Sequence, residues 1–151
     1  EAGLQPPVIR VGNLASRRDY LDVRDVVRAY AIGIGRVQPG EVYNIASGRD
    51  FSGEDVLQML LKHAAVKIEV IVDPNLFRPS DVPRVVGDAR KFQQATGWQP
   101  TYSLEQTLHD LLNDWRHKVL LTQVFVEAKA VPTNDGQPGE PTGSYQSVGN
   151  P

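Results

Sequence analysis

The chain of 151 residues contains no cysteine, and this absence excludes several classes of protein at once. A disulfide framework, a zinc site built from thiolates and a thiol nucleophile all require cysteine. A cysteine-free chain fits a reducing compartment, so we expect a cytoplasmic protein.

The sequence also has little excess charge and no long apolar run. Its formal net charge is −2, so it lacks the basic field that holds a nucleic-acid backbone, and we expect no nucleic-acid partner. No apolar stretch approaches the roughly 20 residues that a membrane span needs, and no signal peptide opens the chain. We therefore expect no membrane association.

Catalytic and cofactor motifs are missing from these 151 residues as well. No glycine fingerprint of the GxGxxG type follows a strand, so the phosphate cradle of a dinucleotide-binding fold is not encoded. Neither a serine–histidine–aspartate set nor a GxSxG elbow is found. His63, His109 and His117 lie on expected helices without the spacing of metal ligands, and we interpret them as surface residues. We expect this chain by itself to bind neither cofactor nor metal.

Strand and helix patterns alternate along the first 119 residues, which predicts an α/β fold with a small sheet and flanking helices. The expected strands cover 8–11, 42–46 and 66–72. The expected helices follow capping residues, with a box partner three residues later in three cases. These signals are Asp22 with Asp25, Ser52 with Asp55, Ser103 with Gln106, and Asp88, whose short helix Gly97 closes. The helix after Asp22 carries an apolar stripe of Val23, Val26, Val27, Tyr30 and Ile34.

Composition divides the chain into three parts. Residues 1–119 form the expected folded region, and 120–131 are either a linker or an edge strand. Residues 132–151 are rich in proline and glycine and poor in large aliphatics, so they cannot offset their ordering entropy and we predict a disordered tail. The first four residues resemble the last turn of a helix before Pro6 and Pro7, so we expect the start to lie inside a larger domain.

Two adjacent arginines at an expected extended segment form the first candidate ligand site. Arg17 and Arg18 point to opposite faces there, so only one of them can enter a given cleft. A guanidinium in a cleft can hold a diphosphate through two parallel hydrogen bonds. Pairing with a neighbouring carboxylate, such as Asp19 or Asp22, is the alternative interpretation.

Two further positions could contact a ligand. Arg78 precedes Pro79, which favours an extended backbone that aims the long side chain, and Asp81 could accept hydrogen bonds from a ribose diol. An ordinary surface loop could have the same sequence. Asn44 lies in an expected apolar strand, where an amide is costly unless a structural group or a ligand bonds it.

The order of these segments closely resembles the C-terminal half of extended short-chain dehydrogenases that act on nucleotide sugars. The segments are VGNLASRRDYLDVRDVVRAY, GEVYNIASG, DPNLFRPSDVPRVVGDARKFQQATGWQP and SLEQTLHDLL. The resemblance runs from Glu1 to about Arg116. Within the superfamily, the sequence is most similar to the GDP-4-dehydro-6-deoxy-mannose reductases and the GDP-mannose 4,6-dehydratases.

The resemblance implies a role for each candidate residue. Arg18 and Arg78 would contact the nucleotide diphosphate, Asn44 would lie beside the nucleotide, and Asp81 would bind the ribose hydroxyls. The strand Ile9-Arg10-Val11 would run along the base, mostly through its backbone. The dehydratases usually have Trp and then Gly-His after the arginine–aspartate pair. Here the sequence continues Tyr-Leu-Asp, which favours a reductase.

The resemblance also implies what a complete enzyme would add. The family's catalytic tyrosine and lysine, their serine or threonine partner and the glycine-rich loop for NADP or NAD would lie upstream of Glu1. We therefore expect a substrate-binding portion of a Rossmann-type enzyme, inactive alone, that binds a GDP-hexose and forms a possible homodimer when full length. A dehydratase, an epimerase and a stand-alone nucleotide-binding module are the alternatives.

Overall fold

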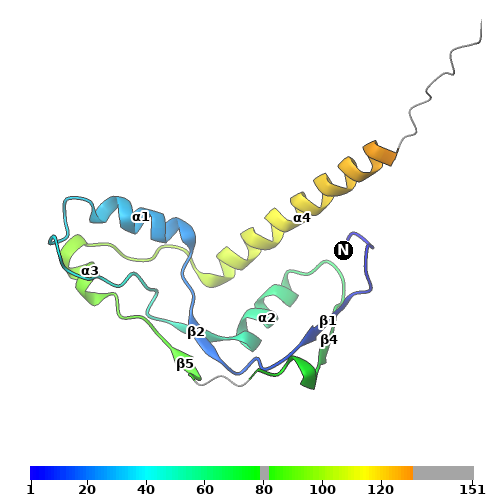
Figure 1. Ribbon diagram of the computed structural model, residues 1–151, viewed down its shortest axis with the longest axis horizontal. Helices are drawn as coiled ribbons and strands as arrows, with labels where there is room; N and C mark the ends of the chain where they lie inside the picture. Colours follow the sequence, from blue (N-terminus) through cyan, green and yellow to red (C-terminus); the bar gives the residue numbers. More distant parts are fainter. Residues whose placement is uncertain (79–81, 131–151) are drawn as a thin grey trace, which may run out of the picture.

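The computed structural model describes residues 1–78 and 82–130, and the expected α/β class is confirmed. Asp81 and the predicted tail at 132–151 lie outside the described residues. Strands and helices are interspersed along the chain, which begins with two strands and ends its described part with two helices, as Figure 1 shows. The strands are β1 (Val8–Val11), β2 (Arg17–Asp19), β3 (Asp50–Ser52), β4 (Glu69–Val72) and β5 (Arg84–Val85). The helices are α1 (Val23–Gly33), α2 (Gly53–Lys62), the 3-10 helix η1 (Pro74–Leu76), α3 (Arg90–Thr96) and α4 (Leu104–Ala130).

The strands form two small sheets. β1 pairs with β4 in parallel, with Val11 opposite Val72. β2 lies at the centre of the second sheet, antiparallel to β3 and parallel to β5. Arg18 therefore has Phe51 on one side and Val85 on the other. This second sheet brings the arginine pair next to the chain that follows residue 82.

The structure contains the helix caps predicted at Ser52 and Ser103. Ser52 accepts a hydrogen bond from the Asp55 amide at 3.0 Å, and the Asp55 carboxylate accepts one from the Ser52 amide at 2.8 Å. At the start of α4, the Ser103 hydroxyl accepts the amide hydrogen bond of Gln106 at 3.2 Å. The first box and the Ser103 cap are thus confirmed, because each needs only residues three apart.

The predicted box at α1 is half right. Asp22 caps the helix by accepting from the Arg24 amide at 2.8 Å. Asp25 does not complete the box but is fully buried, where it accepts from the amides of Thr101 and Tyr102 at 2.9 and 3.0 Å. A tertiary partner therefore replaces the local one.

Helix α3 begins one residue later than predicted. Its N-cap is Ala89, which makes no side-chain capping bond, while Asp88 accepts from the Arg90 amide at 3.0 Å. Gly97 ends the helix in the left-handed conformation at φ 74°, as predicted.

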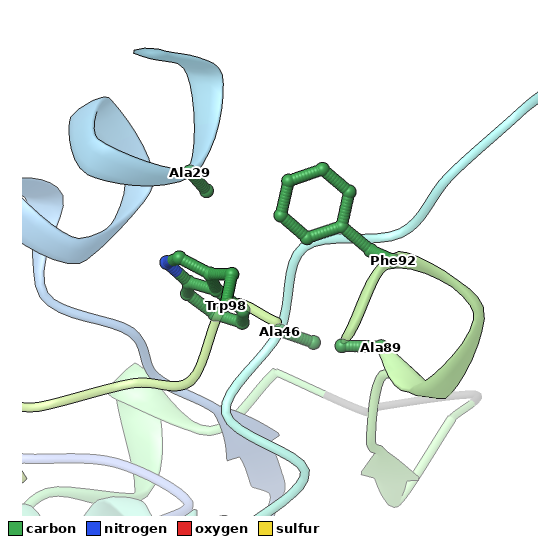
Figure 2. Packing of buried hydrophobic residues seen from close by; sticks show 5 residues of the cluster. All are labelled: Ala29, Ala46, Ala89, Phe92 and Trp98. Carbon is green, nitrogen blue, oxygen red and sulfur yellow. The ribbon is translucent and has the colours of Figure 1, made fainter. Parts of the chain in front are cut away.

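The hydrophobic core lies between α1, α3 and the chain around Ala46. Figure 2 shows Trp98, only 1% exposed, between Ala29 of α1 and Ala46, with Ala89 and Phe92 beside it. Phe92 meets Trp98 edge to face, with 5.7 Å between ring centroids. Aromatic pairs in this geometry contribute roughly 0.5–1.5 kcal/mol beyond their buried area.

The predicted strand at 42–46 is wrong as a paired strand, because the segment belongs to neither sheet. Burial nevertheless alternates over the first four residues: Tyr43 and Ile45 are partly buried against the core, while Val42 and Asn44 are exposed; Ala46 is buried as well. The predicted strand at 66–72 forms only from Glu69 onward. Strand-like side-chain patterning is therefore present at 42–46 without a partner strand in the described part of the chain.

The apolar stripe of α1 faces solvent rather than the core. Its buried face consists of Asp25, Ala29 and Gly33. Four of the five stripe residues are at least 60% exposed, namely Val23, Val27, Tyr30 and Ile34.

Helix α4 continues through residues 120–130, so the edge strand expected as one alternative for 120–131 does not form there. Figure 1 shows its C-terminal half extending away from the rest of the molecule. Among the residues that the structure describes, no helix is both long and apolar enough to cross a bilayer.

Candidate functional site

The two arginines of β2 have different surroundings. Arg17 donates to the Asp50 carboxylate through Nε, to the Asp50 carbonyl through Nη2 at 3.0 Å, and to Asp55 through Nη1 at 3.3 Å. Arg84 donates to the same Asp50 carboxylate at 2.9 Å. The Arg84 and Arg17 guanidinium groups hold the pKa of Asp50 well below its usual range. Arg17 is therefore bound within the sheet as part of an ion network.

Arg18 occupies the next position of β2, where side chains alternate between the two faces of the sheet. It is half-buried, and its Nη1 donates to the Arg17 carbonyl at 2.7 Å. The carboxylates of Asp50 and Asp55 bind Arg17 on the other face of the strand. The role of Arg18 as a diphosphate ligand stays a prediction.

Asn44 lines a cleft of about 610 Å³. One wall comes from residues 43–46, a second from 86–88, and Val26 and Tyr30 of α1 complete it. Asn44 is exposed, so the burial cost expected for an amide in an apolar strand does not arise. Asp88 contributes a carboxylate, whose pKa the Arg90 guanidinium lowers to about 2.

The remaining predicted residues lie near the other sheet. β1 pairs only with β4 in the described chain, and Ile9 and Arg10 are exposed while Val11 is buried. Gly12 follows at once, and a Cβ there would come within 2.2 Å of the Leu76 carbonyl oxygen. This close approach holds the end of β1 against η1.

Arg78 lies two residues beyond η1, exposed on the segment that Gly12 brings beside β1. The structure thus places Arg78 near the β1 edge, and Arg18 and Asn44 near the second sheet. Asp81 is not among the described residues.

A larger apolar groove of about 780 Å³ lies elsewhere, between the N-terminal segment, α2 and α4. Its polar feature is an ion pair between Glu1 and Arg116, in which Arg116 lowers the pKa of Glu1 to about 2. This groove contains none of the candidate ligand residues except Ile9. Within the described residues, no group of three or more potential ligands is arranged to hold a metal.

Asp19 is the residue that sequence reasoning missed at this site. Its carboxylate accepts hydrogen bonds from the Ser47 amide at 2.9 Å, the Ser47 hydroxyl at 2.6 Å, the Gly48 amide at 2.9 Å and the Gly87 amide at 3.1 Å. We considered Asp19 only as a partner of an arginine. No local sequence signal reveals these bonds, because the donors lie 28 to 68 residues away.

Known proteins resemble this chain over most of its described length. A family model for GDP-mannose 4,6 dehydratase matches residues 1–111. GDP-6-deoxy-D-mannose reductase from Pseudomonas aeruginosa is 34% identical over 117 residues, covering 78% of this chain and 38% of the relative. GDP-mannose 4,6 dehydratase 2 from Arabidopsis thaliana is 27% identical over 139 residues, covering 87% of this chain and 37% of the relative.

Solved structures agree. RMD from Pseudomonas aeruginosa, complexed with NADPH, superimposes with a TM-score of 0.71 at 34% identity, covering 77% of this chain and 38% of that one. The chain thus spans less than two fifths of the length of the relatives it matches. Since the family model covers well over half of the 151 residues, the chain belongs to the GDP-mannose 4,6 dehydratase family, within the NAD-dependent epimerase/dehydratase superfamily.

Proposed function

We propose that this chain is the substrate-binding portion of an NAD(P)-dependent reductase that acts on a GDP-linked 4-keto-6-deoxy hexose. The observation that carries the proposal is the family-model match over residues 1–111, a range that includes Arg18, Asn44 and Arg78. Asp50 and Asp55 bind the guanidinium of Arg17 in β2, and Arg18 lies on the other face of the strand. The 34% identity to a GDP-6-deoxy-D-mannose reductase supports the substrate class.

Each predicted ligand residue has a task in this proposal. Arg18 and Arg78 bind the diphosphate by charge-assisted hydrogen bonds, and Asp81 binds the ribose hydroxyls. Asn44 lies beside the nucleotide, and the edge of Ile9-Arg10-Val11 that pairs with no strand in the described chain follows the base. Binding energy from these remote groups positions the sugar for reaction, which is how non-reacting parts of a substrate contribute to catalysis.

In this proposal, hydride transfer takes place in the part of the full-length enzyme that corresponds to the unmatched region of the relatives. The cofactor, NADP or NAD, would be held there, and we expect no turnover by the 151-residue chain alone because it lacks a glycine fingerprint and the tyrosine–lysine pair. A homodimer of the full enzyme in the cytoplasm stays a prediction.

Two surfaces support docking of such a second part. The exposed stripe of α1 is apolar over three turns, and a patch of this kind on a soluble protein marks an interaction site. Beside it, residues 42–46 have strand-like alternation but no partner strand in the described chain. A sheet edge of a Rossmann domain would supply both the missing hydrogen bonds and an apolar face.

A GDP-mannose 4,6-dehydratase is the second candidate, favoured by the family model itself. The sequence Tyr20-Leu21-Asp22, where dehydratases usually have Trp and then Gly-His, favours the reductase. A fusion of the non-matching part of the Pseudomonas reductase to this chain would discriminate between them. Oxidation of NADPH with the 4-keto sugar supports a reductase, and water loss from GDP-mannose supports a dehydratase.

Calorimetric titration of the chain with GDP tests the proposed site directly. Arg18→Ala and Arg78→Ala should each weaken binding about ten- to a hundred-fold, because a charge-assisted hydrogen bond contributes roughly 1.5–3 kcal/mol. Because both arginines hold one diphosphate, the double variant should depart from additivity.

Arg17→Ala is the matched control, since Arg17 is adjacent but occupied by carboxylates. It should lower the melting temperature and leave GDP affinity within about two-fold, by the same affinity arithmetic. Equal losses for Arg17 and Arg18 would show that the strand faces are misassigned. An unchanged affinity in Arg78→Ala would remove that loop from the site.

A further inference from the structure

We propose that Asp19 is a positioning residue, whose carboxylate fixes the separation between the two walls of the Asn44 cleft. The inference rests on the nucleotide-sugar site proposed above and assigns the side chain that shapes it. Asp19 is the last residue of β2 and directly follows Arg18, one of the proposed diphosphate ligands.

The bonds of Asp19 join two segments that are far apart in the chain. One oxygen, Oδ1, accepts from the amide and the hydroxyl of Ser47, at 2.9 and 2.6 Å. The other oxygen, Oδ2, accepts from the amides of Gly48 and Gly87, at 2.9 and 3.1 Å. Each oxygen thus has two donors, and Oδ2 bridges from the first segment to the second.

These donors adjoin the residues that line the cleft. Ser47 and Gly48 directly follow the wall at 43–46, which carries Asn44, and Gly87 is itself part of the wall at 86–88. The two walls also touch, since a Cβ on Gly87 would come within 2.3 Å of the Ala46 Cβ. Contact with Ala46 limits how close the walls can come, and the carboxylate limits how far they can separate.

An amide in place of the Asp19 carboxylate would disrupt these four hydrogen bonds while keeping the size of the side chain. Asp19→Asn substitutes an NH₂ donor for one acceptor oxygen, so at least one of the two donor pairs would face another donor. A donor left without its acceptor costs free energy, and the wall that carries it would move to reach water. The expected result is a wider, more mobile cleft with Arg18 unchanged.

Two measurements on the 151-residue chain test the proposal. Hydrogen exchange followed by NMR should show faster exchange at the Ser47, Gly48 and Gly87 amides in Asp19→Asn. Calorimetry with GDP should show affinity reduced about ten-fold, the equivalent of roughly 1.4 kcal/mol. Asp19→Glu, which keeps both acceptor oxygens, should restore part of the protection and of the affinity.

Asp50→Asn is the matched control. Asp50 lies directly opposite Asp19 in the β2–β3 pair, but its carboxylate bonds Arg17 and Arg84 rather than the cleft walls. It should leave exchange at the three amides unchanged. If Asp50→Asn and Asp19→Asn accelerate exchange equally, Asp19 acts only through general stability and the proposal is wrong.

A double-mutant cycle separates this proposal from the proposed function. Asp19→Asn and Asn44→Ala should be non-additive in GDP affinity because both alter one wall, whereas Asp19→Asn and Arg78→Ala should be additive. Fully additive losses with Asn44→Ala would overturn the positioning role. If the wild-type chain does not bind GDP, the nucleotide site fails as a proposal for this chain, while the exchange data still decide whether Asp19 holds the walls.

Discussion

At the scale of single residues, carboxylates determine how the segments of this chain are held together. Asp25 is fully buried in α1 and accepts from the amides of Thr101 and Tyr102 and the hydroxyl of Thr101, at 2.8 to 3.0 Å. Burial by itself would raise the pKa of Asp25, but the Tyr102 amide, the Arg28 guanidinium and the Thr101 groups outweigh it and lower the pKa. Asp25 therefore stays charged and joins α1 to the loop before α4.

Asp25→Ala should destabilise the chain strongly, because it leaves the amides of Thr101 and Tyr102 without their acceptor. A buried donor left unpaired costs about 1–3 kcal/mol, so the loss should be at least about 2 kcal/mol. With roughly 2–4 °C of melting temperature per kcal/mol, thermal unfolding should shift down by about 5 °C or more.

Asp114→Ala is the control for Asp25→Ala, since Asp114 forms an exposed pair with Lys118 one turn later on α4. Its loss should cost less than about 0.5 kcal/mol. A shift as small for Asp25→Ala as for this control would show that the Thr101 and Tyr102 bonds contribute nothing net.

At the scale of elements, the residue at which a helix starts depends on local capping. The face that a helix buries depends on the segments that pack against it. The Ser52 and Asp55 box begins α2 by reciprocal side-chain to amide bonds. The periodicity of apolar residues predicts that the α1 stripe faces the core, but the stripe is exposed. Asp25, Ala29 and Gly33 are buried instead. Gly33 permits this, since a Cβ there would approach the Phe92 ring to 3.3 Å.

Ser52→Ala should cost about 1 kcal/mol by removing the N-cap of α2. Chemical denaturation should show a lower midpoint with an unchanged slope, because the surface exposed on unfolding stays the same. Ser52→Thr, which keeps the accepting hydroxyl, is the control and should retain most of the stability. A Thr variant as unstable as the Ala variant would mean that packing around Ser52, rather than its cap, is responsible.

At the scale of the whole molecule, the proposed docking of a second structural unit concerns the side of the chain that carries the exposed α1 stripe. Val26 and Tyr30 of the α1 stripe line the Asn44 cleft together with residues 43–46, a segment that pairs with no strand in the described part of the chain. The matched relatives are more than twice as long as the matched segment. A nucleotide sugar in the cleft would then lie between this chain and the docked unit.

Val27→Asp should leave the melting temperature of the isolated chain unchanged within the roughly 0.5 kcal/mol typical of surface substitutions. In a fusion with the non-matching part of the Pseudomonas reductase, the same change should lower the melting temperature and NADPH oxidation, because it would bury an unpaired charge. Leu111→Asp, at an exposed position on α4, is the control. Identical behaviour of the two variants in the fusion would exclude the α1 stripe as the docking face.

Several features follow from the sequence alone because their partners are near neighbours. The caps at Ser52 and Ser103 need residues three apart, Gly97 ends α3 by its own left-handed backbone, and the alternation of a strand separates Arg17 from Arg18. The motifs around these arginines also identify the family, since their order along the chain is itself sequence information.

Other features were decided only by the tertiary structure. Asp25 does not form the predicted local capping box but accepts from amides 76 and 77 residues away, and Asp19 accepts from donors up to 68 residues away. The sequence around each aspartate therefore contains no signal for these hydrogen bonds. Residues 42–46 have the pattern of a strand, but pairing requires a second backbone, and within the described chain none is supplied. Sequence determines what a segment can form locally; which of its groups find partners depends on the segments that folding brings beside it.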